Sequence, residues 1–170
     1  MICFSGSRAQ ITASEFAAAM AYAAELAFAG PPWHESRGQA WQMIGRMAAD
    51  AQRSGFVLAI AFAGHGTRVA GFGYGVDREC GDWTCARSFS EPAPFEFCEL
   101  AVRPERHGEG IGRTLHDAVL RETGPRSRWL TTHPAARPAM NLYRNRGWRT
   151  SQLYPSRADG SPRVLMTRQS

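Results

Sequence analysis

The sequence predicts an α/β protein of the mixed α+β type, in which about four helices flank a central mixed sheet of about six to seven strands. An apolar strand at 95–102 is followed by a glycine-rich loop, a helix and a second strand at 129–132. A strand–helix–strand unit of this kind places its strands parallel, with a right-handed crossover. Strand-like runs separated by turn residues predict two antiparallel pairs: 56–62 with 69–75, and 148–154 with 163–167.

The remaining elements are predicted from residues that typically begin or end helices and strands. Residues 1–4 are compatible with a short first strand, which Ser5-Gly6-Ser7 ends. An alanine-rich helix with Thr12 or Ser14 as its N-cap ends before Gly30-Pro31-Pro32. Ser36 is expected to cap the second helix. The four expected helices are 15–26, 36 to about 54, 111 to about 123, and 138–147.

A glycine-rich segment, residues 103–114, follows the strand at 95–102; we call it the glycine loop. Gly108, Gly110 and Gly112 lead directly into the helical spacing that begins at Ile111. Glycines let the backbone approach a ligand closely, and the free N–H groups at a helix N-terminus favour negative charge. The segment therefore predicts a site for a phosphate or a pyrophosphate.

Two common phosphate motifs do not fit the glycine loop. A P-loop requires Lys after its last glycine, whereas Arg113 follows Gly112 and the chain contains no lysine. A dinucleotide-binding fingerprint needs the spacing Gly-x-Gly-x-x-Gly, whereas here each glycine is two residues from the next.

The glycine loop instead resembles the coenzyme A loop of the GNAT superfamily of N-acetyltransferases. Leu100-Ala101-Val102 matches that family's strand end, Gly110-Ile111-Gly112 matches the loop core, and His107 stands where Arg or Gln is usual. Further along, 136–148 resembles a second family element, matching at Ala139, Leu142, Tyr143 and Gly147, with Trp148 replacing Phe and Ala136 replacing Asn. The resemblance implies a GNAT-like fold with a splayed parallel pair, one acetyltransferase domain over 1–170, and acetyl-CoA as cosubstrate. The cofactor-binding residues that it implies are Leu100, Ala101, Val102, His107, Gly108, Glu109, Gly110, Ile111, Gly112, Arg113, Thr114, Ala139 and Tyr143.

The same resemblance implies catalytic residues. Tyr143 matches the tyrosine that protonates the leaving thiolate, and a phenol is protonated at neutral pH. Two carboxylates on the central strand, Glu96 and Glu99, are candidates for the base that deprotonates the amine, directly or through a water. Glu96 is slightly favoured by its spacing from Val102. His133 and His116 are weaker candidates, and His116 is expected on the solvent face of its helix.

Candidates for acceptor binding lie in loops. In the GNAT family, the connection between the first two helices often lines the acceptor site. By this resemblance, the candidates for acceptor binding are Trp33, His34 and Glu35. The alternative is a loop tryptophan packed on the core. The long loop 77–94 combines acidic residues with Trp83, a mixture that suits a cationic amine, although an ordinary solvated loop explains it as well.

Composition narrows the class of protein. The formal charge of +5 is carried by arginine alone, without a basic run interleaved with aromatics, so nucleic-acid binding is not expected. No apolar run is long enough for a membrane span and no signal peptide is apparent, so a cytoplasmic protein is expected. Four cysteines without paired histidines predict no metal site.

The expected activity is transfer of an acetyl group from acetyl-CoA to a primary amine of a small polar molecule or a peptide. The alternative is a catalytically idle module of the same fold that binds acyl-CoA. An edge strand can pair with the same strand of a second copy, so the sequence is compatible with a homodimer. The sequence does not identify the acceptor amine.

Overall fold

A computed structural model of the chain describes residues 2–64, 68–78, 93–156 and 159–169, and it confirms the predicted fold class. Seven strands form one sheet in the order β1-β2-β3-β4-β5-β7-β6. Strands β4 and β5 run parallel, whereas the pairs β1–β2, β2–β3, β5–β7 and β6–β7 are antiparallel. The strands are β1 (Ile2–Ser5), β2 (Val57–Phe62), β3 (Val69–Asp77), β4 (Phe95–Val102), β5 (Arg128–Thr132), β6 (Arg149–Pro155) and β7 (Pro162–Arg168). The helices are α1 (Gly6–Glu15), α2 (Ala17–Phe28), α3 (Arg37–Asp50), α4 (Ile111–Arg121) and α5 (Arg137–Asn145).

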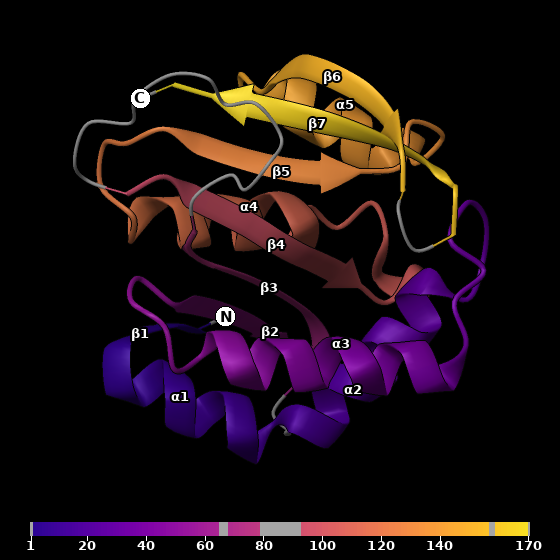
Figure 1. The fold of residues 1–170 in the computed structure, drawn as a ribbon. Coiled ribbons are helices and arrows are strands. Elements are labelled where there is room, and N and C mark those ends of the chain that lie inside the picture. The colour runs from indigo at the N-terminus through magenta and orange to yellow at the C-terminus, as the bar shows by residue number, and fades with distance from the viewer. Residues whose placement is uncertain (1, 65–67, 79–92, 157–158, 170) are drawn as a thin grey trace. The chain divides into compact units, whose positions relative to one another are not determined.

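The chain divides into two compact units. The first comprises Met1–Val76 and Cys98–Gly124, and its core is formed by α1, α2, α3 and the strands beside them. In Figure 1 these three helices, indigo to purple, lie together next to β1 and β2. Among its largest fully buried side chains are Met20, Met43, Leu58, Ile60 and Phe72.

Helix α1 was not predicted from the sequence. The alanine-rich helix starts at Ala17 and not at residue 15, because Phe16 interrupts the helical backbone with φ −103° and ψ 11°. The Phe16 ring packs edge-on against Phe62 of β2, with ring centroids 5.2 Å apart. This contact places a helix break inside a segment whose residues all favour helix.

The predicted cap of α3 is confirmed. The Ser36 hydroxyl oxygen accepts a hydrogen bond from the Gln39 N–H at 3.4 Å, and the Gln39 side chain accepts from the Ser36 N–H at 2.8 Å. This reciprocal capping box satisfies two N–H groups that a helix start otherwise leaves unpaired. The helix ends at Asp50, a few residues before the predicted end.

The second unit comprises Asp77–Phe97 and Pro125–Ser170 and contains β5, β7, β6 and α5. In Figure 1, α5 lies behind β6 and β7. Trp129 and Leu165 are buried there, with Tyr154 packed against them. At the β6–β7 connection, the Ser161 hydroxyl donates to Asp159 at 2.6 Å, and this hydrogen bond is the main cause that lowers the Asp159 pKa to about 2.

The parallel ladder between β4 and β5 is short. It consists of Phe95 opposite Arg128 and Glu96 opposite Trp129, although β4 continues to Val102 and β5 to Thr132. The parallel pair that the sequence predicted is therefore confirmed over these two residue pairs.

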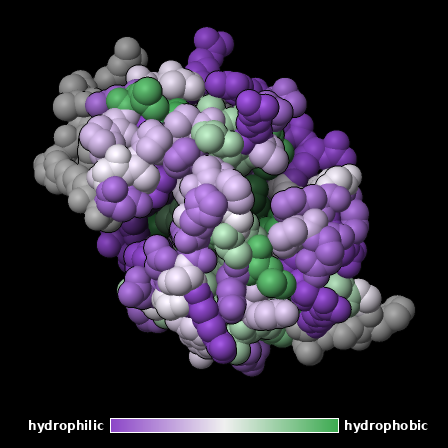
Figure 2. All heavy atoms as spheres, turned by 90° about the vertical axis from the view of Figure 1, so that its right-hand side faces the viewer, coloured by the Kyte–Doolittle hydropathy of each residue, from purple (hydrophilic) through white to green (hydrophobic). Residues whose placement is uncertain are grey.

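The described surface carries few large apolar side chains. On the face shown in Figure 2, hydrophobic residues form small groups among hydrophilic ones. The exposed large hydrophobic residues come from five different elements: Ile2, Ile11, Tyr22, Trp41 and Leu153. Within the described residues, no helix has the length and hydropathy needed to cross a bilayer.

Candidate active site

The glycine loop forms a tight connection from β4 to α4. After Val102, Pro104–Arg106 make one turn of 3-10 helix, and Gly108 and Gly110 then take positive φ angles of 84° and 77°. Gly110 is the N-cap of α4 in a left-handed conformation, which glycine adopts without the strain of a Cβ atom. The first N–H groups of α4 follow directly, and such groups have no carbonyl partner within their own helix.

Three hydrogen bonds hold the backbone of the loop. One ring nitrogen of His107, Nε2, lies 3.0 Å from the Val102 carbonyl oxygen and ties the loop back to the last residue of β4. The Thr114 hydroxyl and the Thr114 N–H each donate to the Gly110 carbonyl at 3.0 Å. The sequence predicted His107 and Thr114 as cofactor contacts, which stays a prediction; in the structure both side chains bind the loop backbone.

An ion pair spans the turn at Gly108. Arg106 donates two hydrogen bonds to the Glu109 carboxylate, both of 2.6 Å, in a bidentate arrangement. The hydrogen bond from Arg106 lowers the Glu109 pKa, and Glu109 in turn raises the Arg106 pKa. The pair is exposed, so it adds little to global stability. A Cβ atom added at Gly108 would meet nothing within 4 Å, so the space beside this turn is open.

Arg103, at the start of the glycine loop, was not predicted as a site residue. It is only 4% exposed, and its guanidinium pairs with Glu105 at 2.6 Å and lies 5.3 Å from the centre of the Tyr22 ring. Its N–H donates to the Ala70 carbonyl of β3 at 2.9 Å. Arg103 thus connects the loop to β3 and α2, a role that no local motif reveals because Tyr22 and Ala70 are distant in sequence.

The end of β4 lies unusually close to β3. A Cβ atom on Gly71 would lie 2.7 Å from the Ala101 carbonyl oxygen and 3.2 Å from the Val102 Cα atom. Both neighbours are backbone atoms and cannot rotate away. Leu100-Ala101-Val102, the predicted cofactor-contacting strand end, therefore depends on a glycine in the adjacent strand.

Replacing Gly71 with Ala is expected to destabilise the protein by about 1–3 kcal/mol, because the added methyl group overpacks the β3–β4 contact. Thermal melting measures this as a Tm several degrees lower. The matched control is Gly45→Ala in α3, where the new Cβ meets nothing within 4 Å and alanine favours the helix. Equal melting temperatures for Gly71→Ala and the wild type would contradict the steric argument.

Tyr143 lies on α5, in the second unit. It is 6% exposed, and its ring makes edge contacts with Phe97 at 6.3 Å and with Trp148 at 6.1 Å between centroids. Ala139 lies one turn earlier on α5 and is half-buried. The ring contacts fix the position of the Tyr143 phenol, which is the group predicted to act as an acid.

The two predicted carboxylates have different arginine partners. The Glu96 Oε2 atom lies 2.7 Å from an Arg78 guanidinium nitrogen, and the Glu96 side chain is 13% exposed. Glu99 is 25% exposed and lies 3.9 Å from Arg46 of α3. Residues three apart on a regular strand point to opposite faces, which agrees with this separation of partners.

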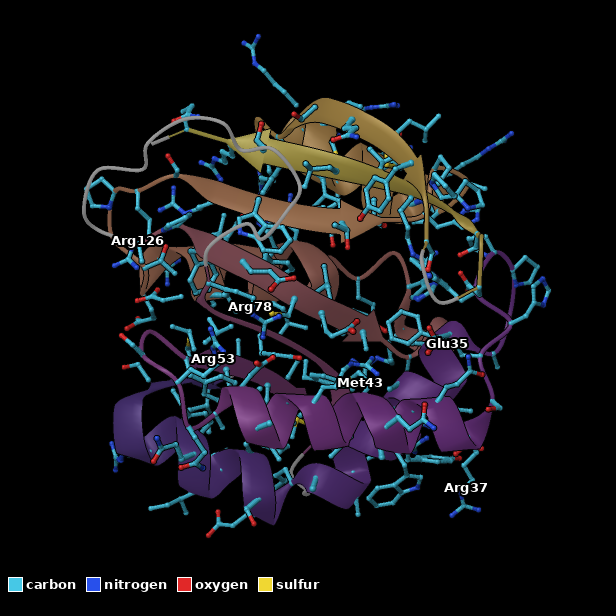
Figure 3. The ribbon with its side chains drawn as sticks, viewed as in Figure 1. Glu35, Arg37, Met43, Arg53, Arg78 and Arg126 are labelled. Carbon is cyan, nitrogen blue, oxygen red and sulfur yellow. The ribbon has the colours of Figure 1, made fainter. Side chains whose placement is uncertain are left out.

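The predicted acceptor residues lie after α2. Trp33 packs edge-on against Phe28 with centroids 5.8 Å apart, and Glu35 donates its N–H to the Phe28 carbonyl at 2.9 Å. His34 is exposed and has a positive φ of 49°. Trp83 lies outside the described residues. Figure 3 labels Glu35, which lies two residues before α3 begins.

One sequence expectation is corrected. His116 is fully buried in α4 and is not on a solvent face; its Nδ1 atom lies 2.9 Å from the Asp117 carboxylate. Leu115, Ala118 and Val119 on the same helix are also buried. The buried face of α4 therefore includes a polar side chain beside its hydrophobic ones.

The predicted site residues therefore fall into two groups. The first unit holds the glycine loop, the end of β4, Glu99 and the residues 33–35. The second holds Glu96, Ala139 and Tyr143. No group of three or more His, Cys, Asp or Glu side chains that could hold a metal ion occurs among the described residues.

The family is identified by comparison with known proteins. The family model described as Acetyltransferase (GNAT) family matches residues 18–148, and the chain belongs to this family. A comparison with curated proteins found no significant match.

Solved structures share the fold. Aminoglycoside 6'-acetyltransferase type Ii is 14% identical with a TM-score of 0.67, over 99% of this chain and 97% of that chain. A chain of the NatC complex bound to Gag peptide and CoA is 13% identical with a TM-score of 0.65, and the match covers 99% of this chain and 98% of that chain. The ribosomal-protein-S18-alanine N-acetyltransferase from Escherichia coli is 16% identical with a TM-score of 0.62, and the match covers 99% of this chain and 92% of that chain.

Proposed function

We propose that the protein transfers the acetyl group of acetyl-CoA to a primary amine of a small polar molecule or a peptide. The observation that carries this proposal is the arrangement of the glycine loop, in which two glycines with positive φ lead directly into the N-terminus of α4. A helix N-terminus preceded by a glycine turn binds phosphate groups through its N–H groups and its dipole. Membership of the GNAT family supports the same cosubstrate.

The residues fit a diphosphate group. The space beside Gly108 is open, and the exposed Arg113 in the first turn of α4 offers a positive charge. The backbone of residues 108–114 would hold the phosphates, and Leu100-Ala101-Val102 would flank the rest of the cosubstrate. Among the fold neighbours, the NatC complex was solved with CoA.

The reaction needs a base and an acid. The neutral amine nitrogen attacks the thioester carbonyl carbon, the carbon–sulfur bond breaks, and the nitrogen releases a proton to solvent, so that an amide and a thiolate form. A β4 carboxylate, Glu99 or Glu96, accepts the proton that the ammonium must lose, and the Tyr143 hydroxyl donates a proton to the thiolate. A backbone N–H near Leu100 would stabilise the oxyanion that forms during attack.

The acceptor is a cationic amine at neutral pH, so it needs acidic or aromatic surroundings. Trp33, His34 and Glu35 of the first unit supply these groups, and Trp83 is proposed with them from the sequence alone. The fold neighbours include acetyltransferases of an aminoglycoside and of a ribosomal protein's alanine, so both small molecules and peptides belong in the search.

The test is an acetylation assay with the purified protein. Acetyl-CoA is mixed with a panel of aminoglycosides, polyamines and short peptides, release of the CoA thiol is followed with a thiol reagent, and products are identified by mass spectrometry. Thiol release that depends on one class of amine supports the proposal. Tight acetyl-CoA binding without transfer to any amine would assign the protein to acyl-CoA binding alone, and absence of binding would overturn both assignments.

A further inference from the structure

A ring of contacts joins three residues of the second unit, Arg78, Glu96 and Trp129, which we call the Arg78 clasp. The Arg78 guanidinium lies 2.7 Å from the Glu96 carboxylate. The Trp129 indole N–H donates to the Arg78 carbonyl oxygen at 3.1 Å. Glu96 and Trp129 are themselves directly opposite each other in the parallel ladder, which closes the ring.

The backbone of Arg78 is held at both ends. Its N–H donates to the Pro94 carbonyl at 3.0 Å, and its carbonyl accepts from Trp129. Arg78 follows β3 directly but contacts both strands of the parallel pair through these groups. A second ion pair lies beside the clasp, where Arg126 reaches Asp77 at 2.6 Å; Figure 3 labels both arginines.

The clasp is located at one structurally special point. Glu96 and Trp129 form the last pair of the β4–β5 ladder, so the clasp holds the strands where their pairing stops. Two of the three residues are largely protected from solvent, because Trp129 is 9% and the Glu96 side chain 13% exposed. The Arg78 side chain is 33% exposed, so the ion pair is partly buried, and a partly buried pair is more costly to break by removing one partner than a fully exposed pair.

We propose that Arg78 is a positioning residue that, through Glu96 and Trp129, fixes the last pair of the β4–β5 parallel ladder. The kinetic part of this inference rests on the proposed acetyl transfer. In that reaction the Glu96 carboxylate stays paired with Arg78 and accepts no proton. Glu99 is then the β4 carboxylate that takes the proton of the amine. The ion-pair partner of Glu96 is Arg78; the Asp77–Arg126 pair and Arg128, which is opposite Phe95 in the ladder, are further charged groups on these elements.

The first test needs no substrate. Thermal melting is measured for Arg78→Gln, Trp129→Phe and the double variant, with Arg126→Gln as the control that breaks the neighbouring ion pair instead. Both clasp substitutions leave the Arg78 N–H contact to Pro94 intact, so local folding is retained. We expect the double variant to lower the Tm by less than the sum of the two single shifts, so that its Tm lies close to that of Arg78→Gln. Additive shifts would overturn the clasp, whether or not an acetylated amine is found.

The second test separates positioning from proton transfer. Arg78→Gln and Glu96→Gln are expected to lower kcat by the same factor, about 10- to 100-fold, because a misplacement of about 1 Å has an effect of this size. The KM for acetyl-CoA should stay within about threefold, because the clasp shares no residue with the glycine loop. Adding Glu96→Gln to Arg78→Gln should cause no further loss, Arg78→Lys should recover part of kcat, and Arg126→Gln should match the wild type.

A different kinetic pattern would overturn the assignment of Glu96 to the clasp. If Glu96 is the base, Glu96→Gln lowers kcat far more than Arg78→Gln does, by about 10²–10⁴-fold, and it does so in the Arg78→Gln background too. Glu99→Gln would then have the smaller effect. The failure of acetyl transfer itself is recognised separately, since it leaves the melting comparison unchanged.

Discussion

Replacing Gly110 with Asp is expected to weaken acetyl-CoA binding at least about 100-fold, or about 2.8 kcal/mol. Gly110 is the N-cap of α4 with φ 77°, a conformation that Asp tolerates better than most residues. Its carboxylate would accept the N–H groups at the start of α4, as N-cap residues do, and so occupy the place of a phosphate with a negative charge of its own. Calorimetric titration with acetyl-CoA and with free CoA measures the loss.

The matched control is Gly110→Asn, which has the shape and the capping ability of Asp without its charge. Both variants have room, since the nearest described atom to a Cβ at 110 is an Arg113 guanidinium nitrogen at 3.5 Å. We expect Gly110→Asn to bind within about tenfold of the wild type, because it adds no like-charge repulsion. Equal losses in the two variants would mean that bulk, and not charge, excludes the ligand, and would argue against a phosphate at this position.

Replacing Tyr143 with Phe is expected to lower kcat about 100-fold or more with little change in the KM for acetyl-CoA, because only the proton donor to the thiolate is removed. Phenylalanine keeps both edge contacts, with Phe97 and with Trp148, so the fold should be retained. Steady-state kinetics with the best amine from the panel gives kcat, and thermal melting gives the stability.

The same change at Tyr154 provides the control for Tyr143. Tyr154 packs against Trp129 and Leu165 and belongs to no proposed part of the site. Tyr154→Phe should leave kcat unchanged. A Tyr143→Phe variant with kcat within about threefold of the wild type would make Tyr143 a packing residue and leave the thiolate to be protonated by water.

Features that depend on neighbouring residues could be predicted from the sequence. The Ser36 cap, the β2–β3 hairpin and the turn from β4 into α4 each rest on contacts between residues close in the chain. Glycine at 108 and 110 is explained from the sequence by close approach of the backbone to a ligand, and the structure shows that both positions also have positive φ angles. The parallel pair followed from the handedness of the strand–helix–strand connection, a rule that needs no side-chain detail.

Features that depend on distant contacts could not be predicted. The break at Phe16 is stabilised by Phe62, and the Arg78 clasp joins residues from the end of β3, from β4 and from β5. No spacing in the sequence distinguishes Arg78 from the other arginines. The burial of His116 depends on how α4 packs, which its own hydrophobic pattern does not describe.

The two kinds of glycine at this site differ in how evolution can change them. At Gly108 the positive φ angle disfavours side chains other than Asn or Asp, and a side chain would also enter the open space proposed for the diphosphate. At Gly71 the obstacle is the backbone of Ala101 and Val102. Substitution at position 108 is therefore limited by the backbone conformation and by the proposed ligand, whereas any side chain at position 71 requires a compensating shift of the strand that precedes the glycine loop.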